Sequence, residues 1–205
     1  MSESEPLRHT LGAKKPKVVL VGEAWGATEE KEGFPFLGMA GIELAKMLMD
    51  AGLGSSLPSL SFISPQTMLG HWLSQRELLL TNVFNLRPPF NDLDSLLVGK
   101  AEAAHPVGIR PSKYVPASLM PHVERLWAEL ELLRPNLVIP LGVVATWAVL
   151  GSPKLAPIRG TTQVEPKLGL KVLPTWHPAA VLRQYALRPI CVMDFSQGED
   201  GKKLP

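Results

Sequence analysis

Four short apolar runs constrain the fold of this chain more than any other feature of its sequence. Each is apolar along most of its length instead of alternating with polar residues, which is typical of strands buried on both faces of a parallel sheet. The runs cover Lys17–Val21, Leu78–Val83, Leu137–Leu141 and Leu170–Pro174. Segments with helical spacing of apolar residues lie between them, at 41–51, 118–133 and 143–150. The sequence therefore predicts an α/β fold in which helices cover both faces of a four-stranded, mainly parallel sheet.

The length and composition are those of one globular unit. With 205 residues, of which 45% are hydrophobic, we expect a single domain over residues 1–205, with its core within 17–195 and flexible ends. The net charge of +2 neither requires nor excludes a polyanionic partner, because a basic surface would have to come from local clustering. We expect the protein to be a monomer.

Cysteine and histidine usage argues against a metal centre. The single cysteine, Cys191, excludes an internal disulfide and a cysteine-built zinc or iron–sulfur site. The five histidines show no paired metal-ligand spacing, and no phosphate-binding glycine motif follows any strand. We therefore expect no metal and no cofactor, and a reducing, cytoplasmic location. The most apolar stretch, 137–150, is interrupted by Pro140 and Gly142, so we expect no membrane association.

Two segments lack a clear pattern. Residues 54–75 are rich in Ser, Pro and Gly, and residues 87–116 carry Pro, Asn, Asp and Lys with little periodicity. Both are predicted to be long surface loops.

Unusual residues follow each predicted strand. If the strands are parallel, their carboxyl ends meet at one edge of the sheet, where the working groups of such folds lie. The segments at these ends are 22–26, 81–89, 141–142 and 174–178. The sequence therefore predicts a cleft that gathers a carboxylate, an amide, a histidine and several aromatic rings.

Six ordered motifs carry a family resemblance. They are Gly22-Glu23-Ala24-x-Gly, Gly33-x-Pro35-Phe36-Leu37-Gly38-x-Ala40-Gly41, Thr81-Asn82-Val83 leading to Arg87-Pro88-Pro89, Leu141-Gly142-x-x-Ala145, Arg159-Gly160, and the run from Pro174 to Arg183. The presence of all these motifs in this order resembles the uracil-DNA glycosylase superfamily, most closely its family 4 type. The resemblance covers about 17–195 and implies a three-layer α/β/α sandwich around a short parallel sheet.

The resemblance also implies a base-binding pocket. Phe36 matches the aromatic residue that stacks on a flipped base, although a core phenylalanine is an equal alternative on residue type alone. Asn82 matches the asparagine that reads uracil, whose O4 and N3–H suit an amide donor and acceptor; its alternative is a turn former. Gly22 and Trp25 belong to the same predicted pocket.

Catalytic candidates come from three positions. His177 matches a histidine that would donate a hydrogen bond to the departing base anion. Glu23 and Glu29 match acidic positions that would orient water or offset positive charge on the sugar. Glu23 is the stronger candidate, because Glu29 also fits a solvated acidic loop.

Contacts to the DNA backbone and stack are expected from the same loops. The candidates for phosphate contacts are Arg87, Lys113, Thr175, Arg159 and Arg183. Either Val181 or Leu182 would wedge into the gap left by a flipped base.

Two departures from the family 4 pattern stand out. That family carries four cysteines for an iron–sulfur cluster, whereas this chain has one, so we expect region 118–134 to be held by apolar packing. Trp25 stands where the family more often has proline; it either reshapes the pocket or packs under the loop.

These observations predict a DNA glycosylase that hydrolyses the N-glycosidic bond of uracil. Three alternatives remain open: a glycosylase for a modified base, a catalytically weak DNA-binding protein of replication, and a defence role against foreign DNA. DNA is the expected partner in each case, with replication or repair proteins as further partners.

Overall fold

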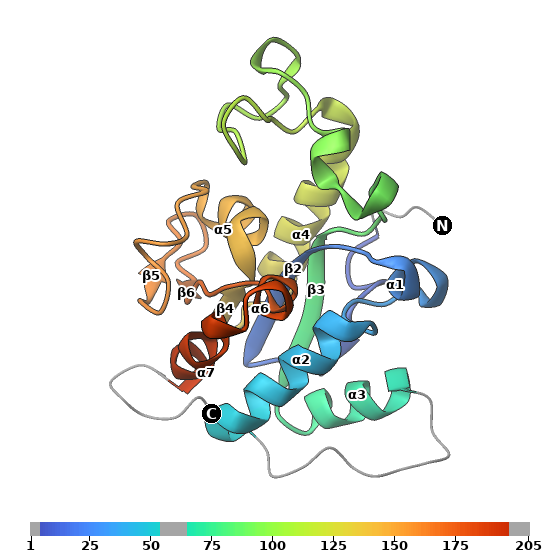
Figure 1. The fold of residues 1–205 in the computed structure, drawn as a ribbon, viewed down its shortest axis with the longest axis vertical. Helices are drawn as coiled ribbons and strands as arrows, with labels where there is room; N and C mark the ends of the chain where they lie inside the picture. The colour runs from blue at the N-terminus through green and yellow to red at the C-terminus, as the bar shows by residue number, and fades with distance from the viewer. Residues whose placement is uncertain (1–4, 54–64, 197–205) are drawn as a thin grey trace.

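A six-stranded sheet forms the centre of the protein, for which a computed structural model describes residues 5–53 and 65–196 (Figure 1). Its strand order is β1-β3-β2-β4-β6-β5. The four inner strands are parallel: β2 (Val18–Ala24), β3 (Leu78–Phe84), β4 (Leu137–Pro140) and β6 (Lys171–Val172). The edge strands β1 (Leu11–Gly12) and β5 (Gln163–Val164) are antiparallel to their neighbours.

The prediction of four strands is therefore wrong in number, and the sheet has six. The predicted apolar runs became the four parallel strands. The two additional strands have two residues each, which is too short to leave a periodic pattern in the sequence. These two strands are defined by their pairing with a neighbouring strand and not by their own composition.

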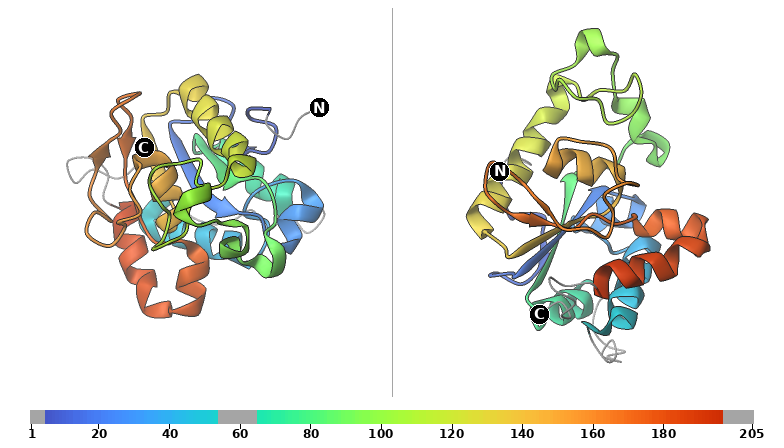
Figure 2. Two further views of the ribbon diagram at one scale, coloured as in Figure 1. Left: turned by 90° about the horizontal axis from the view of Figure 1, so that it is seen from above. Right: turned by 90° about the vertical axis from the view of Figure 1, so that its left-hand side faces the viewer.

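Helices cover both faces of the sheet, so the predicted three-layer α/β/α arrangement is confirmed (Figure 2). One face carries α4 (Met120–Leu133) and α5 (Gly142–Leu150). The other carries α2 (Met39–Leu48), α3 (Pro65–Ser74), α6 (Pro178–Arg183) and α7 (Arg188–Ser196). A short helix, α1 (Ala27–Glu32), follows β2.

Alternate residues of β2 supply the two cores. Val19 and Val21 pack with α4 and α5, whereas Val18 and Leu20 pack with α2, α3 and α7. All four side chains are at most 1% exposed, as expected for a central strand between two helical layers.

The segments predicted as loops are more structured than expected. Residues 65–74 form α3, which buries Trp72 and Leu73 against the sheet, while 54–64 lie outside the described residues. Residues 87–116 form an arm that protrudes at the top of Figure 1. It contains short helical turns at Pro89–Asn91 (η2), Leu93–Leu96 (η3) and Lys100–Glu102 (η4). Further single turns are Met49–Leu53 (η1), Ala117–Leu119 (η5) and Tyr185–Leu187 (η6).

No helix in the ranges 5–53 and 65–196 combines the length and apolar character needed to cross a membrane.

We propose that both cores unfold as one domain, since they share the strands of one sheet. Leu20 and Leu126 lie in different cores and are fully buried. Leu20→Ala and Leu126→Ala should each lower the free energy of unfolding by about 2–5 kcal/mol. Urea unfolding followed by circular dichroism and by tryptophan fluorescence should give one coincident transition for each variant. Two separate transitions would contradict the single domain.

Candidate active site

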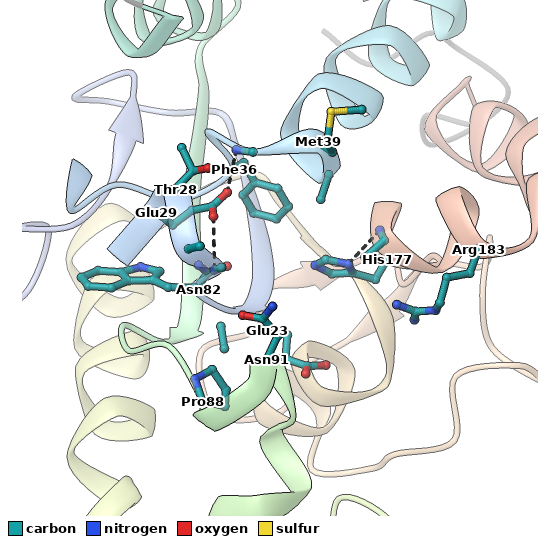
Figure 3. A pocket seen from close by; sticks show the side chains of 17 residues that line it. Glu23, Thr28, Glu29, Phe36, Met39, Asn82, Pro88, Asn91, His177 and Arg183 are labelled. Atoms are coloured by element: carbon teal, nitrogen blue, oxygen red, sulfur yellow. Dashed lines mark hydrogen bonds between the residues drawn. The ribbon is translucent and has the colours of Figure 1, made fainter. Parts of the chain in front are cut away.

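A pocket of about 390 Å³ opens where β2, β3 and the start of α6 meet (Figure 3). It lies beside the carboxyl ends of the parallel strands, as the sequence predicted. Most of the candidate residues for base binding and catalysis line it: Glu23, Trp25, Glu29, Phe36, Asn82 and His177. Arg183, a candidate for DNA contact, also lines the pocket.

The floor of the pocket depends on the missing side chain of Gly22. Parallel pairing places Gly22 opposite Asn82 in the register of β2 and β3. A Cβ atom on Gly22 would lie 2.5 Å from Phe36 Cζ and still closer to Asn82 Oδ1. Glycine therefore allows the ring and the amide to meet over the strand.

Phe36 is held in an unusual backbone conformation. Its φ of 59° lies in the left-handed region, which a bulky side chain rarely occupies and which tends to mark functional sites. Gly41 makes this possible, because any Cβ there would overlap the carbonyl group of Phe36. The Phe36 ring lies nearly parallel to the His177 ring, with 5.8 Å between centroids and 28° between planes.

The hydrogen-bond partner of His177 fixes its tautomer. His177 is the N-cap of α6, and its Nδ1 accepts a hydrogen bond from the Ala179 N–H at 3.1 Å (Figure 3). Burial, with a smaller contribution from the positive charge of Arg183, lowers the pKa of His177 to about 4. The imidazole is therefore neutral near pH 7, and its hydrogen sits on Nε2.

Glu23 faces the pocket in a partly buried position. Burial raises the pKa of its carboxyl group above the usual value, against the opposing effect of Arg110 and Arg183, while Asp92 adds to the rise. Arg110 Nη2 lies 4.0 Å from Glu23 Oε2. Sequence reasoning missed Arg110, because it arrives from the arm and belongs to none of the motifs.

Glu29 is bound to the backbone of its own loop. Its Oε1 accepts from the Gly38 N–H at 2.8 Å and its Oε2 from the Gly26 N–H at 3.2 Å. The side chain is buried, although it lines the pocket. These two bonds hold the loop around the pocket, and the expected role of the Glu29 carboxylate in orienting water stays a prediction.

Trp25 lines the pocket and packs against the segment that precedes β1. Its indole meets the ring of His9 edge-on, at 5.1 Å and 79°. Its backbone N–H donates to the carbonyl oxygen of Leu86 at 2.9 Å. The two alternatives from the sequence are therefore compatible at this position.

Two residues expected to contact DNA are engaged inside the protein. Thr175 is fully buried and its hydroxyl donates to Asp194 Oδ2 at 2.6 Å. Arg159 forms an ion pair with the same carboxylate. Because Asp194 is also buried, this cluster ties α7 to the sheet, and the expected phosphate contacts of Thr175 and Arg159 are not supported.

The remaining candidates for DNA contact differ in accessibility. Val181 is fully buried in the core, whereas Leu182 is 44% exposed, which favours Leu182 as the predicted wedge. Arg183 is exposed at the pocket.

The two other basic candidates have partners inside the protein. Arg87 pairs with Glu30 at 3.2 Å beside the pocket. Lys113 donates to the carbonyl oxygen of Asp94 on the arm.

A buried ion pair on α4 holds the end of β3. Arg125 Nη1 lies 2.5 Å from Glu129 Oε1, and neither side chain is more than 1% exposed. Arg125 Nη2 donates to the carbonyl oxygens of Asn82 and Val83. The Thr81 hydroxyl donates to Glu129 Oε2 at 2.9 Å. The apolar side chains of α4 pack into the core, as expected for region 118–134, and this buried network additionally fixes the backbone that presents Asn82.

The residues present do not fit an iron–sulfur cluster. Cys191 is fully buried in the core on α7. Among the described residues, no group of three or more His, Cys, Asp or Glu side chains is arranged to hold a metal ion.

The Arg125–Glu129 pair generates a stability prediction. Glu129→Ala leaves the Arg125 guanidinium buried without its anion, which should lower the free energy of unfolding by about 3–5 kcal/mol. Glu131→Ala is a matched control, since Glu131 is exposed on the same helix and should change stability by about 0.5 kcal/mol at most. Urea unfolding of both variants is the measurement. Equal losses in the two variants would show that the pair does not stabilise β3.

Comparison with known proteins identifies the family. A family model described as "Uracil DNA glycosylase superfamily" matches residues 9–194. The Type-4 uracil-DNA glycosylase of Archaeoglobus fulgidus is 29% identical over 204 residues, which cover 95% of this chain and 82% of the relative. The Type-4 enzymes of Sulfurisphaera tokodaii and Thermotoga maritima are 27% and 25% identical, and their alignments cover 91% and 89% of this chain and 70% and 76% of the relatives. The chain therefore belongs to the uracil-DNA glycosylase superfamily.

Proposed function

We propose that this protein is a DNA glycosylase that hydrolyses the N-glycosidic bond of uracil and leaves an abasic site. The observation that carries the proposal is the meeting of Asn82, Phe36, Glu23 and a neutral His177 in one pocket. The names of the Type-4 relatives support the same activity.

Base recognition falls to Asn82 and Phe36. A carboxamide can accept from N3–H of uracil and donate to O4, whereas cytosine offers an unprotonated N3 and an amino group. The pairing therefore mismatches cytosine, and a site that leaves buried polar groups unpaired rejects the wrong base strongly. The Phe36 ring, exposed by only 5%, supplies the apolar face of the pocket.

Bond cleavage falls to His177 and Glu23. As the bond between the sugar C1′ and the base N1 breaks, negative charge moves onto the base and positive charge onto the sugar. The Nε2–H of His177 donates to O2 of the departing base, and the Glu23 carboxylate stabilises the sugar cation. Water adds its oxygen to C1′ and releases a proton, and the base anion is protonated, so free uracil and an abasic site result.

The test is an abasic-site assay on single- and double-stranded oligonucleotides that carry uracil, hypoxanthine or a modified pyrimidine, followed by alkaline cleavage. We expect product from uracil. If only a modified base yields product, that base and not uracil is the substrate. Strand binding without product from any base would favour a catalytically weak DNA-binding protein.

Gly22→Ala tests whether the pocket floor matters for the reaction. The added Cβ displaces the Asn82 amide and the Phe36 ring, and a misplacement near 1 Å can lower the rate roughly 100-fold. Gly99→Ala is the control, because its φ is −71° and a Cβ there meets nothing within 4 Å. Abasic-site formation in single turnover should fall only in Gly22→Ala. Equal activity of both variants would show that the space above Gly22 does not matter for the reaction.

The pH dependence of single-turnover hydrolysis follows from the two shifted groups. The pKa of His177 is about 4, so this residue stays neutral above pH 5 and the rate should not fall as the pH rises through 6.5. Glu23 must be ionised, and its pKa is raised above 4.5, so the rate should increase with pH along an acidic limb whose midpoint lies above 4.5. Glu23→Gln should abolish that limb. A decline centred near pH 6.5 would show that a protonated histidine is needed.

A further inference from the structure

Phe90 presents an uncovered aromatic ring at the rim of the pocket. Its side chain is 98% exposed, more than any other exposed large hydrophobic residue of the described chain. It lies on η2 between Pro88 and Asn91, both of which line the pocket. Its chain neighbours therefore place Phe90 beside the pocket, with its side chain in solvent.

The backbone holds this ring outward in an unfavourable conformation. Phe90 has φ 56° and ψ 20°, and Asn91 also has a φ of 56°. Left-handed conformations in two successive residues with side chains are uncommon, and they persist only where the surroundings impose them. No buried packing of the Phe90 ring accounts for the cost.

Several contacts brace the turn. The ring of Pro88 holds its φ at −65°, and the Asn91 N–H donates to the Pro88 carbonyl oxygen at 3.0 Å. Arg87 Nε donates to Asn91 Oδ1 at 2.8 Å, while Arg87 Nη1 reaches Glu30 Oε2 of α1 at 3.2 Å. The turn is therefore tied to α1, the helix that follows β2 and the candidate carboxylate Glu23.

The rest of the pocket mouth has the chemistry of a nucleic-acid groove. Met39 lines the pocket and is 66% exposed, and Leu182 is 44% exposed next to the pocket residue Arg183. Arg110 adds a cation near Glu23, although Asp94 pairs with it. An exposed aromatic ring beside cations is a combination that single-stranded nucleic-acid-binding proteins use for stacking and backbone contact.

We propose that Phe90 is a stacking platform for the base that adjoins the flipped nucleotide on one side. The inference rests on the proposed action on DNA. A flipped nucleotide leaves the neighbouring base with one uncovered face, and the solvated phenyl ring on this braced turn can cover that face. Leu182, which comes from α6 on another side of the pocket, would contact the base on the other side of the flipped nucleotide.

The test is a double-mutant cycle between Phe90 and the neighbouring bases. The probes are single-stranded oligonucleotides with a central 2′-fluoro-2′-deoxyuridine, which resists hydrolysis. In two further strands, a tetrahydrofuran residue replaces the base on the 5′ side or on the 3′ side. Dissociation constants are measured for the wild type, Phe90→Ala, Phe90→Trp and Leu132→Ala. Leu132 is the matched control, since it is 66% exposed near the end of α4 that precedes β4.

Phe90→Ala should bind the complete strand roughly tenfold more weakly, within the range measured for base–aromatic stacking. The loss should shrink to about twofold or less on one of the two strands that lack a neighbour, because the partner of the ring is then missing. Phe90→Trp and Leu132→Ala should bind like the wild type. Unchanged binding by Phe90→Ala, or an equal loss on all three strands, would overturn the proposal.

Hydrolysis of the matching deoxyuridine strand separates this inference from the proposed function. If the loss in Phe90→Ala depends on a neighbouring base but the wild type forms no abasic site, only the proposed glycosylase activity is contradicted. A wild type that forms abasic sites without the coupling contradicts the stacking platform alone. Since the Phe90 side chain is exposed, the melting temperature of Phe90→Ala should match that of the wild type.

Discussion

The parallel pairing of β2 with β3 is the constraint on which the site depends. Its register places Gly22 beside Asn82, and the empty space above Gly22 is filled by the Asn82 amide and the Phe36 ring. A shift by one residue would turn every side chain of a strand to the other face of the sheet. The apolar residues of β2 are buried on both faces, so packing of the two cores and construction of the pocket select the same register.

Polar groups near the pocket are held by specific partners. The Arg125–Glu129 pair binds the carbonyl groups at the end of β3, Glu29 binds two loop amides, and the α6 backbone orients His177. Removing one member of such a buried group is costly because the other is left unsatisfied. The candidate catalytic groups therefore lie on a hydrogen-bonded frame, while the arm adds Arg110 and Phe90 from outside the six motifs.

Much of this arrangement could be predicted from the sequence because its signals are local. The apolar runs predicted the four parallel strands, and the residues after them predicted the pocket that gathers Glu23, Phe36, Asn82 and His177. The two-residue edge strands and α3 were missed because tertiary contacts define them. Arg110 and the Arg125–Glu129 pair carry no motif, and the burial of Thr175 against Asp194 depends on α7 docking far along the chain. Such partners are set by the fold and not by sequence spacing.

If the Asn82 amide reads the base, replacing this side chain should change which base the protein removes. The measurement is the ratio of single-turnover rates of abasic-site formation from uracil and from cytosine, for the wild type and for Asn82→Asp. We expect the wild type to act on uracil, and the preference of Asn82→Asp to shift toward cytosine, because a protonated carboxyl accepts from the N4 amine and donates to N3. An unchanged ratio would show that Asn82 does not read the base.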